Sequence, residues 1–137
     1  MISDTRAAFK AAWVTLLTGV SGIAHVSLVQ KNIPSFTTDQ FPLIRIGESS
    51  GSTSFNITSA AVDILFFEVY VAVKTDVTDD VLSGFVETIT DLMNVNNQVS
   101  DTCDLCFKLS QTAPQEWEES GYKYAVLIYQ VQLRRNF

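Results

Sequence analysis

The stretch SAAVDILFFEVYVAVKT, residues 59–75, decides the fold because it carries the strongest strand signal in the chain. It is rich in Val, Ile, Phe and Tyr, which are the residues most enriched in β-strands. About fourteen residues of strand, each rising roughly 3.3 Å, span on the order of 45 Å. That length is large for a small domain, so we expect part of this strand to project from the core or to bend.

Both faces of this predicted strand are mostly apolar, so both need cover. One face carries Val62, Ile64, Phe66, Glu68 and Tyr70, and the other carries Leu65, Phe67, Val69, Val71 and Val73. Helices can cover one face, and a neighbouring subunit can cover the other. We therefore predict that the strand contributes to a subunit interface through Phe66, Phe67, Val69, Tyr70 and Val71.

Two helices flank the central part of the chain. In SDTRAAFKAAWVTLLTG (3–19) and just beyond it, apolar residues recur at steps of three and four. The expected buried stripe is Phe9, Ala12, Trp13, Leu16, Leu17 and Val20. Ser3 or Asp4 is the expected N-cap, since an oxygen there can accept a bond from a free backbone N–H. Gly19 and Gly22 favour the end of this helix.

The second helix is predicted over TDDVLSGFVETITDLMN (78–94). Thr78 is a good N-cap, and the acidic residues that follow it suit the positive end of the helix dipole. Its expected buried stripe is Leu82, Phe85, Val86, Ile89, Leu92 and Met93.

Shorter strands and loops fill the rest of the sequence. Strands are expected over 23–30, 43–47, 102–112 and 122–135, and loops over 32–40, 94–101 and 113–121. The Ser- and Gly-rich GESSGSTS (47–54) predicts a mobile turn between two strands. The order of elements predicts one α+β domain over residues 1–137, in which a mainly antiparallel sheet has two helices packed on one face.

Composition excludes several classes of protein. The 137 residues are 47% hydrophobic and 18% charged, and the net charge is 9 − 15 = −6. An acidic chain without a basic cluster is a poor sequence-specific DNA binder, because phosphate contacts supply most of that affinity. No segment reaches the roughly 20 apolar residues that a membrane-spanning helix needs, so we expect no membrane partner. We expect a cytoplasm-like compartment with reduced cysteines.

The CDLC stretch (103–106) holds both cysteines of the chain. A structural zinc site takes four ligands, and only His25 is left to join the pair. A redox pair needs a helix N-terminus to lower the thiol pKa, whereas the residues that follow here alternate like a strand. In a strand, residues three apart point to opposite faces. We therefore predict that Cys103 is a small core residue and that Cys106 lies on the outer face.

No other motif predicts chemistry. The serines at 49, 50, 52 and 54 lack a nucleophile elbow, and the 47–54 stretch lacks the Lys-Ser/Thr ending of a phosphate loop. DVTDD (76–80) lacks the full calcium-loop pattern and is explained by helix capping. We expect no enzymatic activity, no catalytic residue, no metal and no cofactor.

A family resemblance runs through most of the chain. After the amphipathic first helix come FPLIRIGE (41–48), the long strand VDILFFEVYVAV (62–73), the helix DDVLSGFVETITDLMN (79–94) and the closing strand YKYAVLIYQVQLRR (122–135). This order resembles the tail terminator, or tail completion, proteins of tailed bacteriophages, the minor tail protein U-like group. The CDLC stretch belongs to no pattern of that family.

The resemblance implies a structural virion protein that assembles in the host cytoplasm. Such proteins form hexameric rings that cap the head-proximal end of the tail tube, stop its growth and join the tail to the neck or head. Genomic DNA passes through the lumen without sequence-specific binding. Six copies at −6 each would give a ring of roughly −36, and we expect part of this charge to line the lumen, where it repels DNA phosphate.

The expected partners are further copies of the chain, the tail tube protein and a neck or head-completion protein. Loops on a rigid scaffold often carry recognition, so we predict tube or neck contacts in 47–54 and 113–120. The candidate contact residues are Glu48, Ser49, Ser50, Gly51, Ser52, Glu116, Trp117, Glu118 and Glu119.

Other functions stay open from the sequence. The main alternative is another phage connector, such as a neck or head-closure protein. A small intracellular redox or metal-binding protein that uses Cys103 and Cys106 is a second, and a monomeric ligand-binding domain is a third. Replacing both cysteines separates the second from the others.

Overall fold

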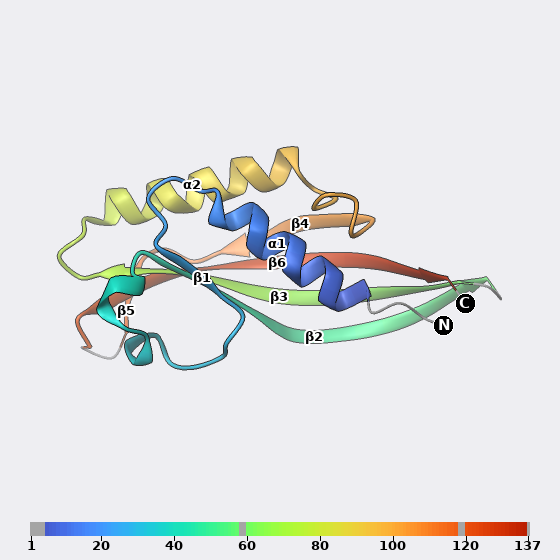
Figure 1. Ribbon diagram of the computed structural model, residues 1–137, viewed down its shortest axis with the longest axis horizontal. Coiled ribbons are helices and arrows are strands. Elements are labelled where there is room, and N and C mark those ends of the chain that lie inside the picture. Colours follow the sequence, from blue (N-terminus) through green and yellow to red (C-terminus); the bar gives the residue numbers. More distant parts are fainter. Residues whose placement is uncertain (1–4, 58–59, 118–119, 137) are drawn as a thin grey trace.

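The fold is known from a computed structural model, which describes residues 5–57, 60–117 and 120–136. Two helices and a mixed sheet of six strands make an α+β fold with the helices packed on one side of the sheet, as predicted (Figure 1). The elements in chain order are α1 (Thr5–Thr18), β1 (His25–Ser27), η1 (Ile33–Ser35), η2 (Thr38–Gln40), β2 (Leu43–Ile57), β3 (Ala60–Lys74), α2 (Asp79–Val95), β4 (Leu105–Gln111), β5 (Gln115–Glu116) and β6 (Tyr122–Asn136).

The sheet has the strand order β1-β2-β3-β6-β4, and the short β5 also pairs with β6. β1 runs parallel to β2, and all the other pairs are antiparallel. The ladder between β3 and β6 is unbroken from Ala60↔Asn136 to Lys74↔Tyr122. The apolar run at 59–75 forms β3, and β6 carries a matching alternation of apolar residues. The two strands can therefore pair over their full length.

One face of β3 packs into the main core. Leu65, Phe67, Val69, Val71 and Val73 are fully buried there. They share the core with the alternate residues of β6 and with the apolar stripes of both helices. The β6 members are Ala125, Leu127, Tyr129, Val131 and Leu133.

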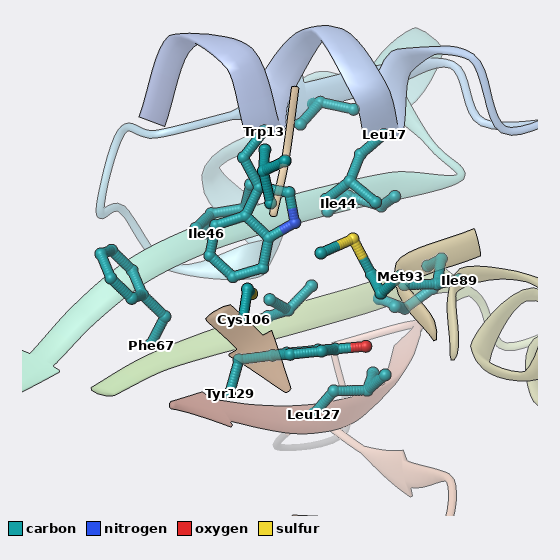
Figure 2. Packing of buried hydrophobic residues seen from close by; sticks show 14 of the residues in the cluster. Trp13, Leu17, Ile44, Ile46, Phe67, Ile89, Met93, Cys106, Leu127 and Tyr129 are labelled. Atoms are coloured by element: carbon teal, nitrogen blue, oxygen red, sulfur yellow. The ribbon is translucent and has the colours of Figure 1, made fainter. Parts of the chain in front are cut away.

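Helix α1 contributes the largest side chain of this core. Trp13 is fully buried and lies edge to face against Phe67, with ring centroids 5.4 Å apart, as well as against Tyr129 (Figure 2). Of the predicted stripe, Phe9, Trp13, Leu17 and Val20 are buried, and Ala12 and Leu16 are partly buried. The predicted caps Ser3 and Asp4 lie outside the described residues.

Helix α2 begins as predicted. The Thr78 hydroxyl oxygen accepts a hydrogen bond from the backbone N–H of Val81 at 3.4 Å. The buried stripe is Leu82, Val86, Ile89 and Met93, and Phe85 and Leu92 are partly buried beside it.

A second, smaller cluster covers one end of the opposite face of the sheet. Its buried members are Ile33, Phe36, Phe41, Leu43 and Ala72. Tyr70, Trp117, Tyr122 and Tyr124 pack against it. The segment 32–40, predicted as a loop, thus holds two single-turn 3₁₀ helices and folds over the sheet to bury Ile33.

One predicted strand is too long, and one predicted turn is a strand. The predicted strand 23–30 is only the three residues of β1, because the chain leaves the β2 edge after Ser27. The predicted turn 47–54 is instead part of the 15-residue strand β2. Ser and Gly favour a turn locally, but pairing with β3 satisfies the backbone groups of this stretch along the whole ladder.

Candidate assembly interface

The most distinctive feature outside the core is a long strand extension. The far ends of β2, β3 and β6 extend beyond the first residues of α1 (Figure 1). We call this extension the arm and define it as residues 50–57, 60–64 and 132–136. The expectation that the long strand projects from the core is met here. Because 47–54 is part of the paired strand β2, the prediction of a turn there is wrong, whereas the tube or neck contact predicted for Glu48, Ser49, Ser50, Gly51 and Ser52 stays a prediction.

Helix α1 is fastened to β2 where the arm begins. Arg6 Nη1 and Lys10 Nζ lie 3.4 Å and 3.7 Å from the two carboxylate oxygens of Glu48. The Arg6 guanidinium also lies 3.9 Å from the carboxylate of Asp63, which is 1% exposed. Next to Glu48, the Ser49 hydroxyl donates to the carbonyl of Phe66 at 3.2 Å. Glu48 and Ser49 therefore hold β2 to α1 and β3 just before the arm begins.

The other predicted contact segment, 113–120, is partly ordered by the sheet. Gln115 and Glu116 form β5 and pair with Tyr124 and Lys123 of β6. Trp117 is half-buried, and its ring lies 5.3 Å from that of Tyr124. Trp117 thus packs against the second cluster, and the contact role predicted for it stays a prediction. Glu118 and Glu119 lie outside the described residues.

The five residues of β3 predicted to form a subunit interface lie on both faces of the sheet. Phe67, Val69 and Val71 are fully buried in the main core, so they are unavailable to a second subunit. Phe66 and Tyr70 lie on the opposite face and are half-buried. The prediction failed for three residues because a strand alternates and the helices of the same chain already cover one face.

The face opposite the helices is only partly covered. At one end Tyr70 stacks with Tyr124 and receives the Arg45 guanidinium 4.1 Å above its ring. Towards the arm, the register places Phe66 beside Gln130 and Phe107 on the other side of Gln130. This part of the face mixes apolar residues with glutamine and lies beyond the second cluster.

Both cysteines lie in the main core, which corrects the prediction for Cys106. Cys103 is 9% exposed and Cys106 is 1% exposed. Strand β4 begins only at Leu105, so Cys103 lies in the preceding turn and strand alternation does not relate the two residues. Cys106 occupies the helix-facing side of β4, next to Val131 in the ladder.

Burial keeps both thiols protonated at neutral pH. It raises the pKa of Cys103 to about 12, with a further contribution from the nearby Asp104 carboxylate. Burial also raises the pKa of Cys106, and the neighbouring Cys103 adds to the shift. The thiolate is the form that attacks electrophiles and binds metals, so these two side chains suit packing better than sulfur chemistry.

The turn before β4 has an unusual backbone. Val99, Ser100 and Asp101 have φ values of 46°, 56° and 62°, in the left-handed region that residues with a Cβ rarely adopt. Val99 is fully buried, and its carbonyl accepts from the Thr102 hydroxyl at 2.6 Å. Packing of Val99 thus holds a strained turn that aims Cys103 into the core.

A groove lies between α2 and β4, with a volume of about 600 Å³. Lys108 crosses it, and its Nζ donates to Thr90 Oγ1 at 3.1 Å and to Gln111 Oε1 at 2.5 Å. Glu87 lines the groove from α2, so the groove has no single sign of charge. The lysine is occupied by neighbours, and the groove lacks the converging groups of a built anion site.

Within residues 5–57, 60–117 and 120–136, no group of three or more His, Cys, Asp and Glu side chains is placed to hold a metal ion. In the same ranges, no helix is long and apolar enough to cross a bilayer. His25 lies half-buried on β1, at the edge of the sheet.

Comparisons with known proteins bear on the fold. No protein-family model matches the sequence, and no curated protein is similar to it. Among solved structures, the chain is similar to a chain in the structure titled "Virion of native gene transfer agent (GTA) particle". The TM-score is 0.53 at 12% sequence identity, and the match covers 96% of this chain and 98% of the other. At this identity the likeness shows a shared fold over almost the full length of both chains.

Proposed function

We propose that the chain is a structural protein of a phage-like virion and that it acts there as the tail terminator. In this role, six copies form a ring at the head-proximal end of the tail tube, end its polymerisation and join the tail to the neck or head. Genomic DNA passes through the lumen. The observation that carries the proposal is the end-to-end likeness to a gene transfer agent virion chain. The resemblance of the sequence to tail terminator proteins narrows the proposed role from a virion protein in general to the tail terminator.

The physical features of the chain support an assembly role. The arm extends strands β2, β3 and β6 past the first turn of α1, and Phe66 and Phe107 are only half-buried on the sheet face opposite the helices. The acidic net charge of −6 suits a ring through which DNA slides, because phosphate is repelled from an acidic wall. The buried, protonated cysteines favour a non-enzymatic role over redox or zinc chemistry.

Deleting the gene from its phage or prophage tests the proposal. Without a terminator, tails grow to irregular lengths and remain separate from heads, and both effects are visible by negative-stain electron microscopy. The wild-type gene supplied in trans is the positive control. Tails of normal length that fail to join heads would favour the neck or head-closure alternative. Intact, infectious particles would refute both.

A second measurement addresses the redox and zinc alternative. A Cys103→Ala/Cys106→Ala variant supplied in trans is expected to restore joined particles, because neither thiol is available as a thiolate. A variant that folds but fails to restore them would favour a chemical role for the pair.

A further inference from the structure

The outer edge of strand β2 is covered by other parts of the chain up to residue 47. β1 pairs with Leu43, Ile44 and Arg45. The Gln30 side chain then donates to the carbonyl of Ile46 at 2.6 Å and lies across the strand at Gly47, where any Cβ would collide with it. Edge strands are commonly protected in these ways, since unpaired backbone groups are a template for another chain.

Beyond that point the protection ends. In the described part of the chain, residues 50–55 have β3 as their only strand neighbour. Their ladder with β3 is regular and lies between the bulges at Glu48/Ser50 and Phe55/Ile57. Their sequence, SGSTSF, contains no proline and no charge. This free β2 edge lacks the residues that normally discourage strand addition.

The opposite side of the sheet has a second free edge on β4. At its start the N–H of Cys106 points away from the sheet and donates to the carbonyl of Asn97 at 2.6 Å. After Cys106, residues 107–111 have β6 as their only strand neighbour in the described ranges. Leu109, at a bulge in this edge, is 48% exposed, and the groove beside α2 leaves the strand open to approach.

The two free edges are complementary in direction. β2, β3, β6 and β4 are antiparallel in succession, so β4 runs opposite to β2. When two copies lie in the same orientation, the β2 edge of one therefore faces the β4 edge of the other as an antiparallel pair. The registers across the sheet place residues 107–111 level with 46–50, so the second copy must be displaced along the strands to bring 107–111 against 50–55. The only charged residue in either edge is Lys108, whose amine is bound to Thr90 and Gln111, so no like charges oppose each other.

We propose that residues 50–55 of one copy add as a strand to residues 107–111 of a second copy. This contact joins two different surfaces, so it repeats from head to tail and closes into a ring when the rotation per copy permits. Backbone hydrogen bonds supply the contact, as in other cases of strand addition. The inference rests on the proposed function for its setting, and it names the contact that would build the ring.

Site-specific cross-linking in assembled particles tests this contact. A photoreactive amino acid replaces Ser54 in the full chain, and particles are built from a mixture of isotopically light and heavy copies. We expect cross-links between light and heavy chains, with the attachment mapped by mass spectrometry to 105–111. The matched control carries the same group at Leu28, which is 41% exposed beside the guarded part of β2. It is expected to give no cross-link to 105–111.

A pair of variants at Gln111 separates edge pairing from mere proximity. The N–H groups of Cys106 and Thr112 donate to Asn97 and Val126 respectively, and alternation then directs the Gln111 N–H away from β6. Gln111→Pro removes this outward donor and is expected to abolish the Ser54 cross-link while the isolated chain stays folded by circular dichroism. Gln111→Ala keeps the donor and is expected to keep the cross-link.

Each outcome decides the inference. Cross-links from position 54 only to another virion protein, or none at all in particles that contain the chain, would overturn it and leave the proposed function standing. Should the chain be absent from particles, the proposed function fails. Cross-linking of the concentrated, purified chain then decides the edge pairing: attachment to 105–111 of a second copy supports it, and its absence refutes it.

Discussion

The indole of Trp13 on α1 meets the phenol ring of Tyr129 on β6 edge to face, with ring centroids 5.5 Å apart and ring planes at 81°. Phe67 of β3 completes the contact from the neighbouring strand. A residue near the start of the chain is thus packed against its last strand (Figure 2). The first helix and the closing strand of the sheet consequently depend on each other for burial.

Trp13→Ala is expected to lower the free energy of unfolding by about 3–5 kcal/mol, because it leaves a large cavity between α1 and the sheet. Val14→Ala is the matched control, since Val14 is the next residue of the same helix and is only half-buried. Its expected cost is about 1 kcal/mol. Urea unfolding followed by circular dichroism measures both, and equal costs would contradict the placement of Trp13 in the core.

Stability is expected to fall as pH rises above about 9, because of the buried thiols. The pKa of Cys103 is about 12 in the folded chain against 9.0 for a free thiol, so the unfolded state loses its proton first. Between these values each such thiol lowers the free energy of unfolding by up to about 1.4 kcal/mol per pH unit. Burial shifts Cys106 in the same direction.

The Cys103→Ala/Cys106→Ala variant isolates this effect. It is expected to cost on the order of 1 kcal/mol per site at pH 7 from lost packing, and to unfold with a flatter pH dependence from pH 8 to 10. Urea midpoints of both proteins across that range provide the measurement. Parallel pH profiles would mean that the thiols titrate normally in the folded chain.

Ser100→Gly is expected to stabilise the chain by about 0.5–1 kcal/mol, because it relieves a left-handed residue in the turn before β4. Ser100 is exposed and has a φ of 56°. Ser83→Gly is the control, since Ser83 is an exposed residue inside α2, where glycine costs about 0.5–1 kcal/mol. Thermal unfolding midpoints should therefore move in opposite directions. A drop for Ser100→Gly would argue against a left-handed turn.

Thr78→Ala is expected to cost about 1 kcal/mol, since it removes the hydroxyl that accepts from the Val81 N–H at the start of α2. Thr88→Ala, at an exposed position inside the same helix, is expected to be neutral or slightly stabilising because alanine is the better helix former. Chemical unfolding of the two variants compares the cap with the helix interior. Similar values for both would show that the cap contributes little.

Sequence reasoning located the strongly periodic elements and missed those that depend on a partner strand. Both helices, β3 and β6 were predicted close to their observed bounds, and Thr78 was predicted as the cap that the structure contains. The stretch 47–54 was misread because Ser and Gly favour turns unless a ladder supplies their hydrogen bonds. The strand edges that we propose as the contact between copies follow from this ladder, and the tube or neck contacts predicted in 47–54 and 113–120 stay predictions.

The sequence by itself determined the α+β class, the two amphipathic helices and the long apolar strand. These features depend on local periodicity and helix capping, which involve neighbours only three or four residues away. Only the tertiary structure decided which face of that strand the helices bury, that Cys103 and Cys106 share one core, and that β2 and β4 end the sheet with free edges. These features arise from contacts between residues far apart in the chain, such as Glu48 with Arg6 or Asn97 with Cys106. No periodicity within a single segment encodes such contacts.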